Sequence, residues 1–285
     1  MKGKAHGPDE MLNSMTRNML RLLRNRALHG VLACASAFLP AAAQSHPDLT
    51  GMWQFEFSGW NPAASPHAPV LKPAAQAIFD KRRASSKTGY VRSVQNILCL
   101  PTAFPVLMMW RSPIEIMSAP GRLSIITEHD PGNDEPRTIY LTEKTHPADI
   151  DETWNGHSIA HWEGPVLVVD TIGFNDRGEL FEGVPRTETT HIVERFRLTG
   201  DGKSLIDQMT IDDPATFVSP WRFEMKFDRL PPDTERLEAV CEPDLDALKA
   251  LDLNSVKDID PEAARLLDPS RHYNAFGNQF LKETK

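Results

Sequence analysis

From residue 121 to residue 241, apolar and polar residues alternate in short runs that turn residues separate. Alternation with a period of two is typical of β-strands that bury one face. The pattern is clearest between Trp221 and Phe227, where apolar residues occupy every second position. Strands are therefore expected at 123–128, 137–141, 158–162, 166–171, 191–198, 203–212, 221–230 and 235–241.

The part of the chain before these runs begins with a strand and then loses its periodicity. Residues 48–57 alternate behind Gly51 and Trp53, a Gly-x-Trp pattern that starts many lipocalin-like barrels. A helix is expected over 74–86. Prolines interrupt residues 88–120, which we expect to be an irregular segment packed on the core. Short strands with one apolar face predict a mainly β fold, an antiparallel lipocalin-like barrel with short peripheral helices.

The first 43 residues have the features of an export signal. A basic region at 16–26 precedes an apolar stretch at 27–40 that is too short and too interrupted to span a bilayer. Alanines ending at Ala43 then supply a cleavage site. We expect a signal peptide that is removed near Ala43, which places the mature protein in the periplasm or outside the cell. The alternative is a lipobox ending at Cys34, which would leave a lipid anchor.

The rest of the chain is expected to form a barrel domain at 44–242 and a helical C-terminal tail at 243–285. No other segment approaches the roughly 20 apolar residues of a transmembrane helix, so we expect no membrane-spanning segment. The formal net charge of −8 argues against a nucleic-acid partner. The sequence leaves the oligomeric state open, with a homodimer as one alternative.

Export changes what the three cysteines imply. Cleavage removes Cys34 and leaves Cys99 and Cys241, an even pair in an oxidising compartment. We expect these two residues to form a disulfide. Two buried free thiols are the alternative if the chain is not exported.

Residues 153–176 gather titratable and aromatic side chains around one expected hairpin. His157 lies among small polar residues at the start of a strand and is a candidate for proton transfer, because imidazole titrates near neutral pH. Asp170 ends the apolar run of the second strand and is expected to orient that imidazole. The alternatives are a purely structural histidine and an aspartate that caps the following turn.

The same segment gives little support to metal or nucleophilic chemistry. His157 and His161 would share one face of a strand, but no third ligand accompanies them. Ser158 next to a histidine is not a catalytic triad, and the sequence has no Gly-x-Ser-x-Gly motif. It also has no phosphate-binding loop and no dinucleotide fingerprint. We therefore expect neither a metal nor a cofactor.

Two carboxylates fall on the apolar faces of expected strands. Glu194 shares a face with isoleucine, phenylalanine and leucine in residues 191–198, and Asp207 has similar neighbours in the next strand. Burial raises the pKa of a carboxyl group towards neutrality, where the group works best as a general acid or base. Glu194 is therefore a candidate catalytic residue. The alternative is that it pairs with an inward arginine or histidine and only locks the barrel.

The remaining candidates would line a pocket for a small hydrophobic or aromatic ligand. Tryptophans are expected to form aromatic walls, with core packing as their alternative role. The expected ligand-binding residues are Trp154, Trp162, Asn175, His191, Asp207 and Trp221.

Several short motifs, each weak alone, together resemble a large family of exported bacterial proteins of mostly unknown function. The motifs include Gly156–Gly164, Leu167–Asp176, Cys99–Pro101, His191–Phe196 and Val240–Glu242. At Ala160-His161 the chain departs from the Gly-Arg of that family. The resemblance covers residues 48–242 and implies an exported β-rich domain with a bridge from Cys99 to Cys241. It implies no particular reaction.

These observations lead to three hypotheses of function. The first is an exported, cofactor-independent lyase or isomerase, in which Glu194 and His157 move protons on a small hydrophobic or aromatic molecule inside the barrel. A lignin-type aromatic dimer that loses formaldehyde would fit such a site. The second is a non-catalytic carrier of a hydrophobic ligand. The third is a structural envelope protein whose hairpin only stabilises the fold.

Overall fold

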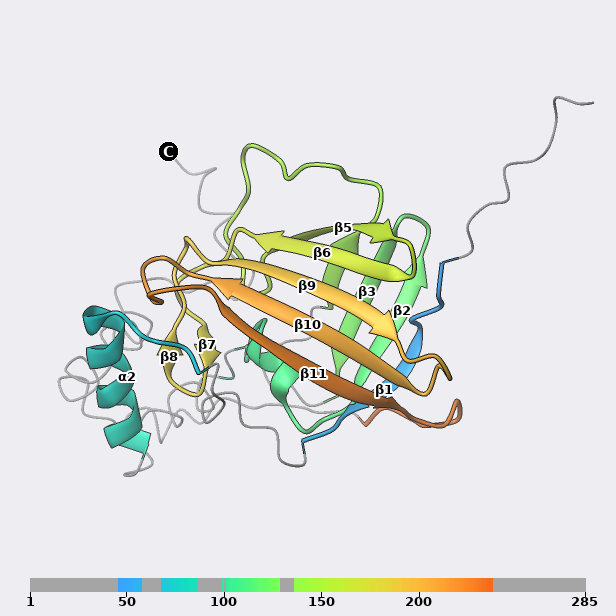
Figure 1. Cartoon of the computed structure of the whole chain (residues 1–285), viewed down its shortest axis with the longest axis horizontal. Coiled ribbons are helices and arrows are strands. Elements are labelled where there is room, and N and C mark those ends of the chain that lie inside the picture. Colours follow the sequence, from blue (N-terminus) through green and yellow to red (C-terminus); the bar gives the residue numbers. More distant parts are fainter. Residues whose placement is uncertain (1–45, 58–67, 87–98, 100, 129–135, 238–285) are drawn as a thin grey trace, which may run out of the picture. The chain divides into compact units, whose positions relative to one another are not determined.

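The computed structural model describes residues 46–57, 68–86, 99, 101–128 and 136–237. Within these residues, nine strands form a closed barrel (Figure 1). In order around the barrel they are β1 (Gly51–Phe55), β2 (Ile114–Ala119), β3 (Arg122–Thr127), β4 (Arg137–Tyr140), β5 (His157–Glu163), β6 (Val166–Ile172), β9 (His191–Leu198), β10 (Ser204–Asp212) and β11 (Trp221–Arg229). Because β11 pairs with β1, the sheet closes on itself, and the expected lipocalin-like architecture is confirmed.

Within the described residues, four further elements lie outside the barrel sheet. They are α2 (Pro73–Ser86), η2 (Val106–Met109), β7 (Glu179–Phe181) and β8 (Val184–Pro185). The helix confirms the expectation at 74–86. Its Arg82 donates to the Gly183 carbonyl at 3.4 Å and lies 3.6 Å from the Glu179 carboxylate. These contacts fasten α2 to the small β7–β8 sheet.

Strand β2 corrects the expectation of an irregular segment through residue 120. Ile114 and Ile116 point into the core, whereas Glu115 between them is partly exposed. The strand pairs with β1 on one side and β3 on the other. The sequence pattern did not predict this strand, because a proline directly precedes it and its alternating run is short.

Several expectations concern the two ends of the chain. The strand expected at 235–241 is absent from its described residues, 235–237. The leader and the tail expected at 243–285 lie outside the described residues. Cys99 is disulfide-bonded, but Cys241 lies outside the described residues, so their pairing stays a prediction. No helix in the described part of the chain has the length and hydrophobicity needed to cross a membrane.

Alternate residues of strands such as β9 fill the barrel, as the pattern predicted. Along β11, Trp221, Met225 and Phe227 are buried, whereas the charged residues between them face outward. Along β10, Leu205 and Met209 are buried in the same way. Burial of these apolar faces is the main force that holds a closed sheet together.

The connection between β4 and β5 departs from the expected antiparallel pattern. These two strands pair in parallel, with Ile139 beside Ser158 and Tyr140 beside Ile159. Parallel neighbours require the chain to return to the starting end of the next strand, so the connection has to cross over. Residues 141–156, termed here the crossover segment, make this return without a helix or strand of their own (Figure 1). This segment contributes to the candidate site.

Trp53 lies where the first and last strands meet. Its side chain is fully buried, and the indole N–H donates to the Leu49 carbonyl at 3.0 Å. The Arg229 guanidinium lies 4.0 Å from the indole ring. It also donates to the carbonyls of Gly202 and Thr50, at 3.1 and 2.8 Å. One arginine thereby covers the tryptophan and joins the two strands that close the barrel.

Replacing Arg229 with alanine should lower the free energy of unfolding by about 1–3 kcal/mol, because the cation–π contact and the hydrogen bonds to the carbonyls are lost. Arg222→Ala is the matched control, since Arg222 is exposed on the same strand. Urea unfolding followed by tryptophan fluorescence measures both variants. An equal effect of the two substitutions would show that Arg229 does not fasten the closure.

Candidate functional site

The barrel interior contains polar side chains within an otherwise apolar core. The inner polar cluster consists of five fully buried residues: Arg137, Ser158, Thr171, Glu194 and Asp207. Arg137 Nη1 donates to Glu194 Oε1 at 2.8 Å, and Nη2 pairs with Oε2. Nη2 also lies 3.3 Å from the Ser158 hydroxyl and 3.2 Å from the Thr171 hydroxyl. The cluster therefore connects β4, β5, β6 and β9 from the inside.

Glu194 faces inward, as the alternation of its strand predicted. The structure supports the alternative that Glu194 pairs with an inward arginine, because Arg137 binds both of its carboxylate oxygens. The Phe104 ring covers the guanidinium at 3.6 Å. A buried charge is tolerated when it is paired and hydrogen-bonded in this way. The pairing favours the alternative that Glu194 locks the barrel, and its role in proton transfer stays a prediction.

Asp207 also faces inward, as predicted, and neither of its carboxylate oxygens has a hydrogen-bond partner among the described residues. Burial raises its pKa well above the usual range, and the nearby charges of Glu194 and Glu224 raise it further. Arg137 opposes this shift only in part. Burial and the neighbouring carboxylates therefore favour the protonated form of Asp207.

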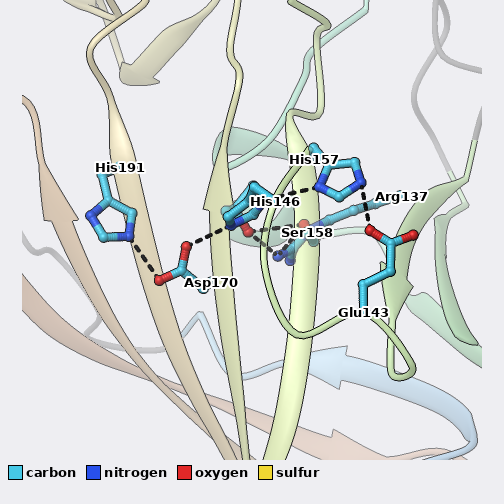
Figure 2. A network of polar contacts seen from close by, with 8 residues as sticks. Arg137, Glu143, His146, His157, Ser158, Asp170 and His191 are labelled. Carbon is cyan, nitrogen blue, oxygen red and sulfur yellow. Dashed lines mark hydrogen bonds and ion pairs between the residues drawn. The ribbon is translucent and has the colours of Figure 1, made fainter. Parts of the chain in front are cut away.

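The outer face of the same strands carries a chain of histidines and carboxylates (Figure 2). His146 Nδ1 lies 2.9 Å from His157 Nδ1, and His146 Nε2 lies 2.9 Å from Asp170 Oδ1. The other Asp170 oxygen, Oδ2, lies 3.0 Å from His191 Nε2. At the opposite end, His157 Nε2 lies 3.4 Å from Glu143 Oε2. These five residues are termed the histidine relay.

The geometry of a strand explains why the relay lies outside the barrel. Successive side chains of a strand point to opposite faces. His157 therefore faces outward next to inward Ser158 on β5, and Asp170 faces outward next to inward Thr171 on β6. His191 extends from the start of β9 on the same outer face, and the crossover segment supplies the two remaining members.

Burial within the relay is greatest in its middle. The side chains of His146 and His157 are 14% and 19% exposed, whereas Asp170 is 40% exposed. Burial lowers the pKa of His157; the charge of Glu143 opposes this effect and that of His146 adds to it. The Tyr140 ring stacks on His157 with 5.1 Å between centroids and covers one side of the imidazole. These contacts favour the neutral form of His157.

Asp170 and His191 shift each other in opposite directions. The hydrogen bond from His191 lowers the pKa of Asp170 and outweighs the effect of burial, and a second bond from His146 adds to it. The hydrogen bond to Asp170 in turn raises the pKa of His191. Asp170 is therefore a carboxylate that accepts hydrogen bonds from two imidazoles.

This geometry limits the number of protons in the relay. A carboxylate only accepts hydrogen bonds, so the Nε2 atom of His146 carries the proton that faces Asp170. The Nδ1 atoms of His146 and His157 can hold only one proton between them, because two N–H groups would otherwise point at each other across 2.9 Å. The proton belongs to His157 when His146 is neutral, and it can pass to His146 without movement of heavier atoms.

The structure joins some of the predicted site residues and separates others. His157, Asp170 and His191 belong to one network, although His146 mediates the contact between the first two. His157 points outward beside inward Ser158, whereas Glu194 is fully buried inside the barrel, which corrects the expectation of one shared pocket there. Glu143 and His146 were not predicted, because the crossover segment has no periodicity that marks its orientation.

The predicted tryptophan walls do not meet around a ligand site. Trp221 is buried in the core, where its ring contacts Phe217 and Phe223. Trp162, at the far end of β5 from the relay, stacks on His46 with 4.6 Å between ring centroids. These two residues therefore take the packing roles that were their alternative.

Trp154 and Asn175 are held by a second buried arginine. Arg186 Nη1 donates to the Trp154 carbonyl at 2.8 Å, and Nη2 donates to Asn175 Oδ1 at 2.9 Å. Nη1 also contacts the carbonyl of Phe104. Burial lowers the pKa of Arg186 to about 9, and two nearby aspartates oppose that shift. The contacts join three loops and give the Asn175 side chain a structural role, whereas only the backbone of Trp154 takes part, so the role expected of its indole stays a prediction.

Two further observations concern where a ligand or a metal could bind. A surface pocket of about 500 Å³ lies beside Arg229 and is lined by Lys203, Asp228, Leu230 and Pro231, so no member of the relay borders it. In the part of the chain that the structure describes, no group of three or more His, Cys, Asp or Glu side chains is arranged to hold a metal.

Comparisons with known proteins do not identify this site. No protein-family model matches the chain, and a search of curated proteins finds none that is significantly similar. The resemblance to exported bacterial proteins therefore stays a prediction.

Replacing Asp207 with asparagine should stabilise the fold at about pH 8 and do so less at about pH 4. The pKa of Asp207 is raised on folding, so the wild type loses unfolding free energy as pH rises above the unfolded value of 3.8. The loss is at most about 1.4 kcal/mol per pH unit, and asparagine removes it. Thermal unfolding over this pH range checks the slope. Equal destabilisation at all pH values would show that Asp207 is ionised and paired.

Replacing Asp170 with asparagine should lower the melting temperature more at about pH 5 than at about pH 9. The raised pKa of His191 means that its stabilising contribution is complete below the unfolded value of 6.5 and is lost as pH rises through the folded value. The lowered pKa of Asp170 means that its own contribution disappears only in stronger acid.

The control for this variant is Glu56→Gln, which removes a partner of Lys226 and leaves the histidines intact. Its effect should be the same at both pH values. A pH-independent effect of Asp170→Asn would contradict a charged pair with His191.

Proposed function

We propose that this chain is an exported, cofactor-independent lyase or isomerase that acts on a small hydrophobic or aromatic molecule by acid–base chemistry. The observation that carries the proposal is the histidine relay, in which three imidazoles and two carboxylates are in contact on one partly buried face. Imidazoles transfer protons well near neutral pH. The proposal moves the chemistry from the barrel interior to the outer face of β5 and β6.

His157 is the proposed base. Its Nδ1 atom faces His146, so Nε2, on the side of Glu143, is the nitrogen that a bound molecule can approach. Burial lowers the pKa of His157 and keeps the ring neutral before reaction. After Nε2 takes a proton, the Nδ1–H group donates to His146, and Asp170 stabilises the charge through the other nitrogen of His146. Carboxylates orient catalytic imidazoles by this kind of contact.

The relay can also return the proton. Transfer between the two Nδ1 atoms carries positive charge from His157 to His146, next to the carboxylate of Asp170. The reverse transfer restores an acid at His157. Elimination, isomerisation and hydration each need a base and then an acid at one place, and this pair of imidazoles supplies both.

Loss of formaldehyde from a hydroxymethyl-bearing aromatic dimer of the lignin type illustrates the chemistry. The base takes the hydroxyl proton, and the C–O bond becomes the carbonyl of formaldehyde. The electrons of the broken C–C bond form a C=C bond as an oxygen substituent leaves the neighbouring carbon. The protonated imidazole gives a proton to that oxygen, so the balance needs no oxidant or reductant.

Two observations support the ligand class and the compartment. The aromatic ring of Tyr140 lies flat against His157 and offers an apolar surface beside the proposed base. Cys99 is disulfide-bonded, as is usual for proteins of oxidising compartments outside the cytosol. We propose cleavage of the leader near Ala43 and a periplasmic or secreted mature chain.

The two alternatives receive less support. A carrier of a hydrophobic ligand needs space inside the barrel, where large side chains such as Trp221, Phe196 and Arg137 are fully buried. In the structural alternative, the relay only fastens the crossover segment to β5 and β6. Stability and turnover measured together separate this alternative from an enzyme.

Replacing His157 with glutamine should lower turnover by about 100-fold or more, because glutamine cannot take up the proton. The assay measures formaldehyde released from a panel of hydroxymethyl-bearing aromatic dimers. His161→Gln is the matched control, since this residue lies outward on the same strand, is 66% exposed and does not belong to the relay. It should leave turnover unchanged.

Three results would contradict the proposal. One is a wild-type protein that converts no member of the panel and no isomerisable analogue. Another is equal turnover in the two variants. The last is a His157→Gln protein with a lower melting temperature but full turnover, which would favour the structural alternative.

A further inference from the structure

We infer that His157 and Glu143 together bind a pair of adjacent hydroxyl groups on one ligand, with one hydroxyl on each residue. The ligand class is therefore a vicinal diol, of which catechol is the simplest aromatic example. The inference rests on the proposed function in taking Nε2 of His157 as the atom that meets the ligand. It adds a second contact, to Glu143, which the proposed reaction does not use.

The number of protons in the relay carries this inference. Three contacts that a proton can occupy lie in a row between Glu143 and Asp170 (Figure 2). The contact of Glu143 Oε2 with His157 Nε2 measures 3.4 Å, whereas the other two measure 2.9 Å each. Two neutral imidazoles carry two N–H protons in total. The two short contacts hold both protons, so the longer contact holds none.

The contact without a proton places two acceptors next to each other. Neutral His157 has a lone pair on Nε2, and the carboxylate of Glu143 only accepts hydrogen bonds. Among the described residues, Glu143 has no other hydrogen-bond or ion-pair partner. Both atoms therefore lack a donor within this part of the chain, and they are close enough for one small molecule to supply both donors.

The two acceptors are accessible. The side chain of Glu143 is 37% exposed and that of His157 is 19% exposed. The Tyr140 ring covers one face of the imidazole, with 5.1 Å between centroids and 20° between planes. Stacking engages that face and leaves the edge of the imidazole, where the Nε2 lone pair points, open to a ligand.

Two hydroxyl groups on neighbouring carbons match this pair of acceptors. Their O–H groups can point in the same direction, and the distance between their oxygens is comparable to the 3.4 Å between the acceptors. The hydrogen bond to the carboxylate is charge-assisted and therefore stronger than one between neutral groups. A ligand with a single hydroxyl leaves one acceptor without a donor, which lowers its affinity.

Two probes that differ by one methyl group test this ligand class. Catechol has two adjacent hydroxyls, whereas its monomethyl ether, guaiacol, has one. Each probe is titrated into the full protein by isothermal titration calorimetry, and the imidazole NMR signals of His157 locate the binding. We expect catechol to bind at least about tenfold more tightly, because methylation removes one charge-assisted donor.

Replacing Glu143 with glutamine should remove the preference for catechol. The amide N–H₂ group can donate to Nε2 of His157 and fill the contact, so the two probes should differ by about twofold or less. Glu163→Gln is the matched control, since Glu163 also lies 3.3 Å from a histidine nitrogen, that of His161, outside the relay. This variant should keep the wild-type preference.

Three results would overturn the diol site. They are a wild type that binds neither probe or binds both equally, a preference for catechol that survives in Glu143→Gln, and loss of the preference in Glu163→Gln as well. Tighter binding of benzylamine than of catechol would assign the contact to a cationic group and would also overturn the site.

Binding and turnover are measured separately, so the two proposals can fail separately. A protein that prefers catechol but converts no hydroxymethyl-bearing dimer contradicts the proposed reaction and keeps the diol site. A protein that binds both probes equally but loses turnover in His157→Gln keeps the reaction and contradicts the diol site.

Discussion

A buried arginine holds together the strands that carry the histidine relay. Arg137 extends from β4 into the barrel, where it binds Glu194 of β9 and contacts the hydroxyls of Ser158 and Thr171. A shift of β4 or β9 by one residue would turn Arg137 or Glu194 outward and leave the other charge buried and unpaired. Ser158 and Thr171 are direct neighbours of the relay residues on β5 and β6, so the inner contacts also determine which side chains meet on the outer face.

Side-chain alternation was sufficient to predict much of the barrel. It predicted inward Glu194 and Asp207, because both interrupt otherwise apolar faces, and the structure buries both completely. It did not give the direction of His157. Strand β5 has small or polar residues such as Ser158 on its inner face and Ile159 on its outer face, so hydrophobicity alone does not distinguish the two sides.

The unpredicted part of the site depends on contacts between distant segments. Glu143 and His146 reach the relay because β4 and β5 pair in parallel, and no local sequence signal marks that pairing. The crossover segment then returns along the outside of the sheet. Close approach fixes part of its course: a side chain added at Gly173 would lie 2.5 Å from Ile150. Sequence periodicity describes single strands well, but it cannot describe a connection whose position is set by two other strands.

The closure of the barrel has a consequence for how the chain folds. β1 finds its second partner, β11, only at the far end of the described residues. Until then a sheet made from the earlier strands has two open edges, on β1 and β10, which can pair with any similar edge. Contacts between such distant segments form slowly. The unfinished sheet is therefore prone to aggregate until β11 pairs with β1.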